Sequence, residues 1–264
     1  MDLLQLFSDY GTLAIISIMV LSFIAGFIDS VVGGGGLIQI PALLIALPDA
    51  TLTTIFGTNK ISALSGTSVS AFHYSKRIKF NYKLLFTVSI CAGIASYTGA
   101  KLVSKIDVNT LKPVILFILI VMAIYTFLKK DIGSKQSKQL TLRKQFLYGS
   151  LIGIVVGFYD GFFGPGVGSF FVLGFVVILG FEFVQASAYT KIINCITNIS
   201  ALFVFISHGE YILELAILMA IFNISGNVVG TRMALKKGDS FVRSLFLIIV
   251  SLMIIRYGYD VFIG

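Results

Sequence analysis

Long apolar runs separated by short polar connections fill most of the chain. A transmembrane helix needs about 20 mostly apolar residues. Six runs approach or reach this length, and they cover residues 12–32, 84–103, 113–128, 146–163, 212–230 and 241–257. Together with the shorter and more polar segments described next, this pattern predicts an all-α integral membrane protein with about 8–10 membrane segments.

Two further segments, 51–74 and 182–207, have the length of a span but carry threonine, asparagine, serine and a lysine. Polar groups at membrane depth are costly unless protein or water surrounds them. We therefore expect both segments to face the interior of the helix bundle or a water-filled cavity rather than lipid.

Two short apolar runs, 37–47 and 169–179, each follow a glycine-rich stretch. A straight run of about 11 residues is too short to cross a bilayer. Glycine runs interrupt helices, and irregular backbone is tolerated inside a bilayer only where protein or a cavity surrounds it. The sequence therefore predicts membrane helices that are broken at glycine-rich loops.

Composition supports the membrane interpretation. Hydrophobic residues make up 57% of the chain and charged residues 12%, whereas soluble domains are about 25% charged. The lysines and arginines behind the net charge of +8 lie between the apolar runs, as they do in membrane loops, so no basic face is left for nucleic acid. Residues 1–9 contain two aspartates but no lysine or arginine. We therefore expect the first run to be a retained helix rather than a cleaved signal peptide.

The two halves of the chain match at a constant offset of 131 positions, without a gap. The matched pairs include Gly26 and Gly157, Asp29 and Asp160, Gly33 and Gly164, Gly35 and Gly166, Lys60 and Lys191, and Gly99 and Gly230. We interpret residues 1–128 as a first membrane repeat, 129–145 as a basic cytoplasmic linker and 146–264 as a second membrane repeat. Such internal duplication is typical of secondary transporters.

Loops at matched positions of the two halves differ in charge, and this difference indicates how the two repeats are oriented relative to each other in the membrane. The loop 76–83 contains four basic residues, whereas the matched positions 207–214 contain two glutamates and no lysine or arginine. Because cytoplasmic loops carry the lysine and arginine excess, we expect an inverted topology with five segments per half and the N-terminus outside. The basic stretch 101–112 fits this topology poorly. The alternative has four spans per half and a re-entrant short run, and it violates the rule more severely because it places either the 76–83 or the 232–243 basic cluster outside.

Two glycine clusters are the first candidate for chemistry. Gly33, Gly34, Gly35 and Gly36 precede one short run, and Gly164, Gly166 and Gly168 precede the other. A break followed by a short helix exposes backbone N–H groups and the positive end of the helix dipole, which favours anions. The alternative is that these small residues only allow helices to pack closely.

Two lysines occupy equivalent places in the two polar segments. An intramembrane lysine is a candidate functional residue, and Lys60 and Lys191 could supply positive charge to an anion held by the glycine amides. The alternative is that each lysine extends to the membrane surface. Neighbouring hydrogen-bonding residues are Thr58, Asn59, Thr190, Asn194 and Asn198.

Two aspartates precede the glycine clusters by one helical turn. Asp29 and Asp160 could carry coupling protons, because burial disfavours the charged form of a carboxylate. Alternatively, each could cap amides of its own glycine turn or pair with a lysine.

These motifs resemble the TauE/SafE sulfite-exporter family, also called probable membrane transporter proteins. The chain resembles the first half of the family's sequence at residues 26–36, Pro41 and 57–60. It resembles the second half at residues 157–168, Thr190 and Lys191. The chain departs from a pure glycine run at Pro165 and Val167. The resemblance implies a multi-pass transporter of the cytoplasmic membrane for small anions, often sulfite or organosulfonates.

Other classes of function have less support. No serine, histidine and aspartate set or zinc-protease motif is present, so we expect a non-enzymatic protein without cofactor or metal. The expected partners are a small anionic substrate and the lipid bilayer, with homo-oligomerisation left open. A passive anion channel, or a scaffold or sensor subunit that moves nothing, remains an alternative to a carrier.

Overall fold

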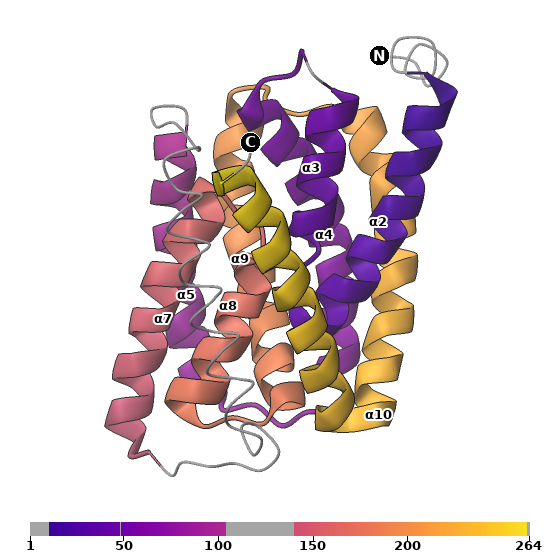
Figure 1. The fold of residues 1–264 in the computed structure, drawn as a ribbon. Helices are drawn as coiled ribbons and strands as arrows, with labels where there is room; N and C mark the ends of the chain where they lie inside the picture. The colour runs from indigo at the N-terminus through magenta and orange to yellow at the C-terminus, as the bar shows by residue number, and fades with distance from the viewer. Residues whose placement is uncertain (1–10, 48, 104–139, 263–264) are drawn as a thin grey trace.

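The computed structural model describes residues 11–47, 49–103 and 140–262 of the 264-residue chain, and this part of the chain is a bundle of helices without strands (Figure 1). The predicted run 113–128 and the basic residues 129–139 lie outside the described residues. Within the described part, the all-α expectation is confirmed.

The helices of the first half lie close to the predicted runs. They are α2 (Thr12–Val32), α3 (Gly36–Ala46), α4 (Leu52–Ser75) and α5 (Tyr82–Leu102). The helix α3 is the predicted short run, and α4 is the predicted polar segment. Side chains of Thr51 and Asn81 accept hydrogen bonds from the backbone at the starts of α4 and α5, which satisfies amides that would otherwise lack partners.

The second half contains α7 (Leu142–Phe162), α8 (Val167–Gly174), the π-helical turn η3 (Phe175–Leu179), α9 (Phe183–Ser207) and α10 (Leu213–Phe262). The helix α7 begins inside the segment assigned to the linker, so residues 142–145 belong to the first turn of a helix. Gly238 interrupts α10 with φ 72° and ψ −163°. This break separates the two helices expected at 212–230 and 241–257.

Four described helices are long and apolar enough to cross a membrane: Thr12–Val32, Tyr82–Leu102, Phe183–Ser207 and Leu213–Ile249. Exposed apolar side chains on these helices recur at helical spacing, as with Phe86, Ile90 and Ile94 on α5. Such stripes mark surfaces that lipid covers. The chain is therefore a multi-pass membrane protein.

The successive helices alternate in direction (Figure 1). From the end where α2 begins, α2 runs into the bundle, α3 returns, α4 crosses to the other end and α5 comes back. In the second half α7 starts at the opposite end, and α8 with η3 returns to it. An 11-residue helix such as α3 is about 16 Å long, so it is a returning arm rather than a full crossing.

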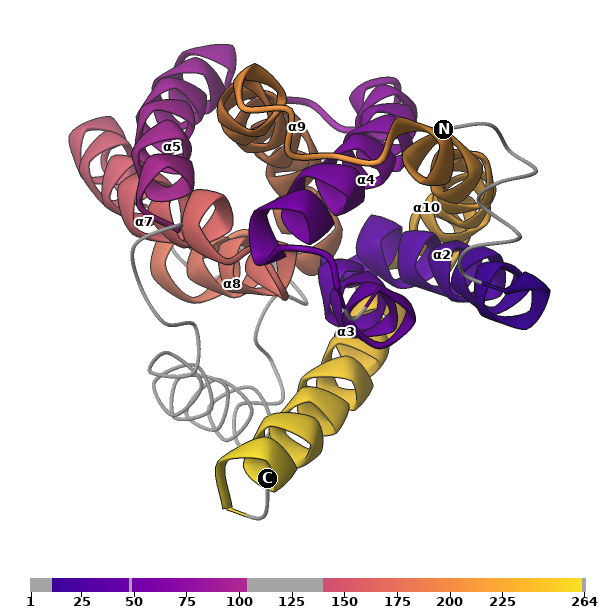
Figure 2. The ribbon, with the colours of Figure 1, turned by 90° about the horizontal axis from the view of Figure 1, so that it is seen from above.

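The helices α4 and α9 form the centre of the bundle. Seen from above, α4 lies between α9, α10 and α3 (Figure 2), and it contacts these three helices and α2. The buried residues of α4 include Thr58, Asn59, Lys60, Ser62 and Thr67. The expectation that both polar segments face the bundle interior is therefore confirmed.

Close helix contacts occur in pairs that follow the offset of 131. The helix α7 packs against α5, and α2 packs against α10. A Cβ added at Gly157 would lie 2.6 Å from Ala92 O, and one added at Gly26 would lie 2.2 Å from Asn223 O. Both glycines therefore allow backbone contact between helices, which is the packing role of small residues in membranes.

The two breaks meet inside the bundle. Gly33 ends α2 with φ 81°, a left-handed conformation, and its N–H donates to Asp29 O at 2.8 Å. A Cβ on Gly33 would lie 2.3 Å from Gly168 Cα. Ser169 N–H also donates to Gly33 O at 3.2 Å. The chain therefore needs glycine at position 33 both for its backbone angle and for contact with the second break.

We predict that Gly33→Ala prevents stable folding, because the methyl group meets Gly168 and also strains the left-handed backbone. The control is Gly209→Ala, where φ is 69° but no atom lies within 4 Å of the added Cβ. This control carries only the backbone cost of about 1–2 kcal/mol. Thermal unfolding of the purified proteins in detergent measures the difference, and equal loss in both variants would contradict a contact role for Gly33.

Candidate functional site

The first of two buried ion pairs joins α4 to α7. Lys60 Nζ lies 2.9 Å from Asp160 Oδ1, and the two side chains are 5% and 2% exposed. Lys60 Nζ also donates to Asn198 Oδ1 of α9 at 3.1 Å. The lysine therefore stays inside the bundle and does not extend to the membrane surface.

The second ion pair joins α9 to α2. Lys191 Nζ lies 3.1 Å from Asp29 Oδ2 and also donates to the backbone oxygen of Asp29. The side chain of Lys191 is fully buried. Thr67 of α4 donates to the same carboxylate oxygen, Asp29 Oδ2, at 3.0 Å. The Asp29 carboxylate thus accepts from one lysine and one hydroxyl, and only the backbone oxygen of Asp29 accepts from the glycine turn.

Each ion pair connects the two halves of the chain. The Lys60–Asp160 pair becomes the Lys191–Asp29 pair when 131 is added to the lysine position and subtracted from the aspartate position. The partners are 100 and 162 residues apart in sequence. Of the alternatives for the two acids, the geometry selects pairing with a lysine, and it is the lysine of the other half.

A small cavity of about 30 Å³ lies at the first ion pair. Eight of the predicted site residues line it: Asp29, Gly33, Gly36, Asn59, Lys60, Asp160, Gly164 and Asn194. The cavity has room for about one or two water molecules. A polyatomic anion would therefore need the surrounding helices to move apart.

The other predicted site residues do not line this cavity but pack around it. A Cβ on Gly34 would lie 3.1 Å from Ile249, and one on Gly35 would lie 2.8 Å from the Cβ of Asp29. Gly168 packs on Gly33, and Gly166 precedes α8 with φ 77°. Thr190 is buried, and its Oγ1 has no hydrogen-bond partner among the described residues. Lys191 lies behind the cavity, on Asp29.

Backbone amides of the two breaks remain available. The N–H groups of Gly34, Gly35, Gly36, Gly166 and Gly168 make no backbone hydrogen bond within the described part of the chain. Gly36 begins α3 and lines the cavity together with Lys60. A helix N-terminus beside a lysine is the arrangement that stabilises a small anion.

Two further residues belong to the site. Thr67 was not predicted, and Asn198 was named only as a hydrogen-bonding neighbour of the lysines. Asn198 lies two turns after Lys191 and binds Lys60, while Thr67 lies two turns after Lys60 and binds Asp29. Both positions follow from helical spacing, because residues seven apart share a helix face. Thr58, in contrast, donates to Thr54 O and accepts from Ile212 N–H. Its hydroxyl therefore stabilises the first turns of α4 and the segment before α10, and it makes no bond to the ion pairs.

Two aromatic rings border the cavity on the side of the α4 N-terminus. Phe56 and Phe163 line the cavity, and their ring centroids are 6.1 Å apart in an edge-to-face arrangement. Phe56 is 2% exposed. One turn earlier on α4, Thr53 lines a different and larger pocket. Phe56 therefore lies about one turn along α4 from a residue that lines the outer pocket.

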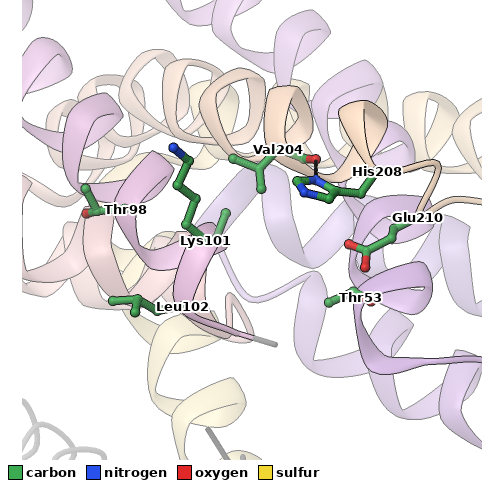
Figure 3. Close-up of a pocket in the computed structure, with 8 residues that line it drawn as sticks. Thr53, Thr98, Lys101, Leu102, Val204, His208 and Glu210 are labelled. Carbon is green, nitrogen blue, oxygen red and sulfur yellow. Dashed lines mark hydrogen bonds between the residues drawn. The ribbon is translucent and has the colours of Figure 1, made fainter. Parts of the chain in front are cut away.

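The outer pocket has a volume of about 530 Å³ and lies among the ends of α4, α5 and α9. Figure 3 shows His208 and Glu210 on one side and Thr98, Lys101 and Leu102 on the other. The ammonium group of Lys101 lies 4.4 Å from the ring centroid of Tyr97. None of the residues predicted to form the site lines this pocket.

Comparisons with known proteins agree with this architecture. The sulfite exporter TauE/SafE family matches residues 18–257, so the chain belongs to this family. A "probable membrane transporter protein ORF9" from Sinorhizobium is 38% identical over 92% of both chains. "Probable membrane transporter protein YfcA" from Escherichia coli K12 is 34% identical over 90% of this chain and 87% of its own. A "probable membrane transporter protein" from Haemophilus influenzae is 31% identical over 96% and 97%. No solved structure gives a significant match.

We predict that Lys191→Met lowers the free energy of unfolding by about 3–5 kcal/mol, because Asp29 is left buried without its counter-charge. The double variant Lys191→Met with Asp29→Asn should recover most of this loss, since no unpaired charge remains. Unfolding of the single and double variants in detergent gives the coupling energy. Additive losses would mean that the two side chains do not interact.

Proposed function

We propose that this protein is a carrier of small anions, and that sulfur-containing anions such as sulfite or simple organosulfonates are its substrates. The observation that carries the proposal is the position of Lys60 beside the free amides of a broken helix, in a cavity buried within the bundle. The sulfur class comes from the family to which the chain belongs.

A carrier is favoured over an open channel by the narrowness of the cavity beside Lys60. This cavity has a volume of about 30 Å³, and the rings of Phe56 and Phe163 line it. Transport then requires the cavity to open to one side at a time, with one half moving against the other. Two acids, Asp29 and Asp160, are the candidates for coupling this movement to protons.

The charge distribution supports an orientation in the cytoplasmic membrane. The connection between α4 and α5, the start of α7 and the break in α10 lie at one end of the bundle (Figure 1). These segments carry exposed basic residues: Lys76, Arg77, Lys79, Arg143, Lys144, Lys236 and Lys237. By the positive-inside rule this end faces the cytoplasm, and the outer pocket faces the opposite compartment.

We predict that Lys60→Met abolishes saturable uptake of labelled sulfite and methanesulfonate into proteoliposomes, because the anion loses its counter-charge. Lys83→Met is the matched control, since Lys83 is exposed near the start of α5, and it should transport like the unmodified protein. Retained transport by Lys60→Met would remove the lysine from the site. Absence of flux for both anions in the unmodified protein would refute the substrate class.

We predict opposite sidedness for two single cysteines placed in a chain whose Cys91 and Cys195 have been replaced by alanine. Ser207→Cys, at the end of α9, should react with a membrane-impermeant maleimide in intact cells. Lys79→Cys should react only after the cells are permeabilised. The reverse result would mean that the protein has the opposite orientation in the membrane. The proposed site would be unchanged by that conclusion.

A further inference from the structure

We infer that the two buried aspartates have different roles, and that Asp160 alone accepts the coupling proton at its Oδ2 atom and thereby releases Lys60 to the anion. This inference deepens the proposed function, since it assigns the coupling step to one atom of the same site. It is carried by the different hydrogen bonding of two carboxylates that are equivalent in sequence.

Both donors to the Asp29 carboxylate bind its Oδ2 atom. This oxygen accepts hydrogen bonds from Lys191 Nζ at 3.1 Å and from Thr67 Oγ1 at 3.0 Å. Lys191 has no exposed surface and also donates to the backbone oxygen of Asp29. Neither carboxylate oxygen of Asp29 is among the buried side-chain oxygens that lack a hydrogen-bond partner in the described part of the chain.

The carboxylate of Asp160 is only half satisfied. Lys60 Nζ binds Oδ1, while Oδ2 is buried and has no hydrogen-bond partner among the described residues. The same holds for Asn59 Oδ1, another buried acceptor. Asp160 and Asn59 line the same small cavity. Two residues that line one cavity thus each carry a buried acceptor without a donor among the described residues, and a buried acceptor without a donor is costly.

A proton on Asp160 Oδ2 supplies that missing donor. The proton forms an O–H bond with Oδ2, cancels the negative charge of the carboxylate and breaks no other bond. The new O–H group can donate to the amide oxygen of Asn59, directly or through a water held in the cavity. Return of the proton to water on the other side of the membrane restores the ion pair.

Charge balance links this proton to the anion. The two lysines and two aspartates of the site sum to zero charge, so a bound monoanion would leave an uncompensated charge in the bundle interior, which is strongly unfavourable. With Asp160 protonated, Lys60 has no counter-charge and can pair with the anion beside Gly36 and Gly164. One proton therefore enters with each monoanion, and loading is electroneutral.

The surroundings of Asp160 contain few other charges. Lys60 of α4 and Asp29 of α2 line its cavity, and Lys191 of α9 is held by Asp29. The helix α5 approaches α7 at this level through Ser96 and Gly99, which carry no charge, and α8 contains no ionisable side chain. Among the carboxylate oxygens of the described residues, Asp160 Oδ2 is the one that is buried without a hydrogen-bond partner.

The two halves have diverged at the positions that make this difference. Asn59, Asn194 and Asn198 surround the Lys60–Asp160 pair, whereas the matched positions near the other pair are Thr190, Ala63 and Thr67. Amide oxygens accept hydrogen bonds, while the Thr67 hydroxyl donates one to Asp29. The amide oxygen of Asn198 thus accepts from Lys60 at the first pair, whereas the hydroxyl of Thr67 donates to Asp29 at the second.

The test is pH-difference infrared spectroscopy of the protein in lipid vesicles without any anion substrate. As the pH is lowered in steps, the carboxylic-acid C=O band of Asp160 should grow. Asp160→Asn should abolish this band, and Asp29→Asn should retain it. A band lost in Asp29→Asn but kept in Asp160→Asn, or no band in the unmodified protein, overturns the inference.

A second variant keeps the test decisive if Asp160→Asn does not fold. Asn59→Leu removes the acceptor, so the C=O band should shift in frequency. The matched variant Thr190→Leu should leave the band unchanged. An unchanged band in Asn59→Leu overturns the role of Asn59 and of the cavity in holding the proton.

Proton uptake on addition of methanesulfonate at constant pH separates this inference from the proposed function. A protein that transports methanesulfonate but takes up no proton when it binds is a carrier in which Asp160 does not couple. A protein that shows the infrared titration of Asp160 but binds no sulfur anion retains the proton site and loses the proposed substrate class.

Discussion

The structure depends on the requirement that a charge inside a membrane protein has a counter-charge close by. Lys60 and Lys191 lie on the central helices α4 and α9, and their partners Asp160 and Asp29 lie on α7 and α2. Because each pair joins the two halves, neither half satisfies its own charges. The pairs hold the last turns of α2 and α7 against the centre of the bundle, and this brings the two glycine breaks together.

Much of the fold was predictable from the sequence because lipid imposes length and hydrophobicity on each span. The runs at 12–32, 84–103 and 182–207 became α2, α5 and α9 almost unchanged. The paired lysines were also recognisable, since a lysine is unusual in an apolar segment and the repeat presents it twice. The partner of each lysine was not predictable in this way, because residues 100 and 162 positions apart become neighbours only after the halves pack. The inverted relation of the repeats and their membrane orientation stay predictions.

The separate roles of the glycines could not be predicted from the sequence. A glycine that lines a cavity and one that allows helix contact look the same in a sequence. In the structure Gly36 and Gly164 face the cavity, whereas Gly34 and Gly168 pack against protein. The difference comes from the direction in which each backbone position faces, and that direction is set by the left-handed turns at the breaks.

The crossed pairing also constrains how such a protein can arise. A chain of half this length carries one lysine and one aspartate at these positions, and it cannot pair them within itself in this geometry. Two copies packed in the manner of α2 with α10 and α5 with α7 would form both ion pairs from a single set of residues. Fusion of two such copies into one polypeptide preserves the pairs and frees each copy to change separately. Asparagine stands at 59, 194 and 198, whereas the matched positions hold threonine at 190, alanine at 63 and threonine at 67, so the two pairs have different neighbours.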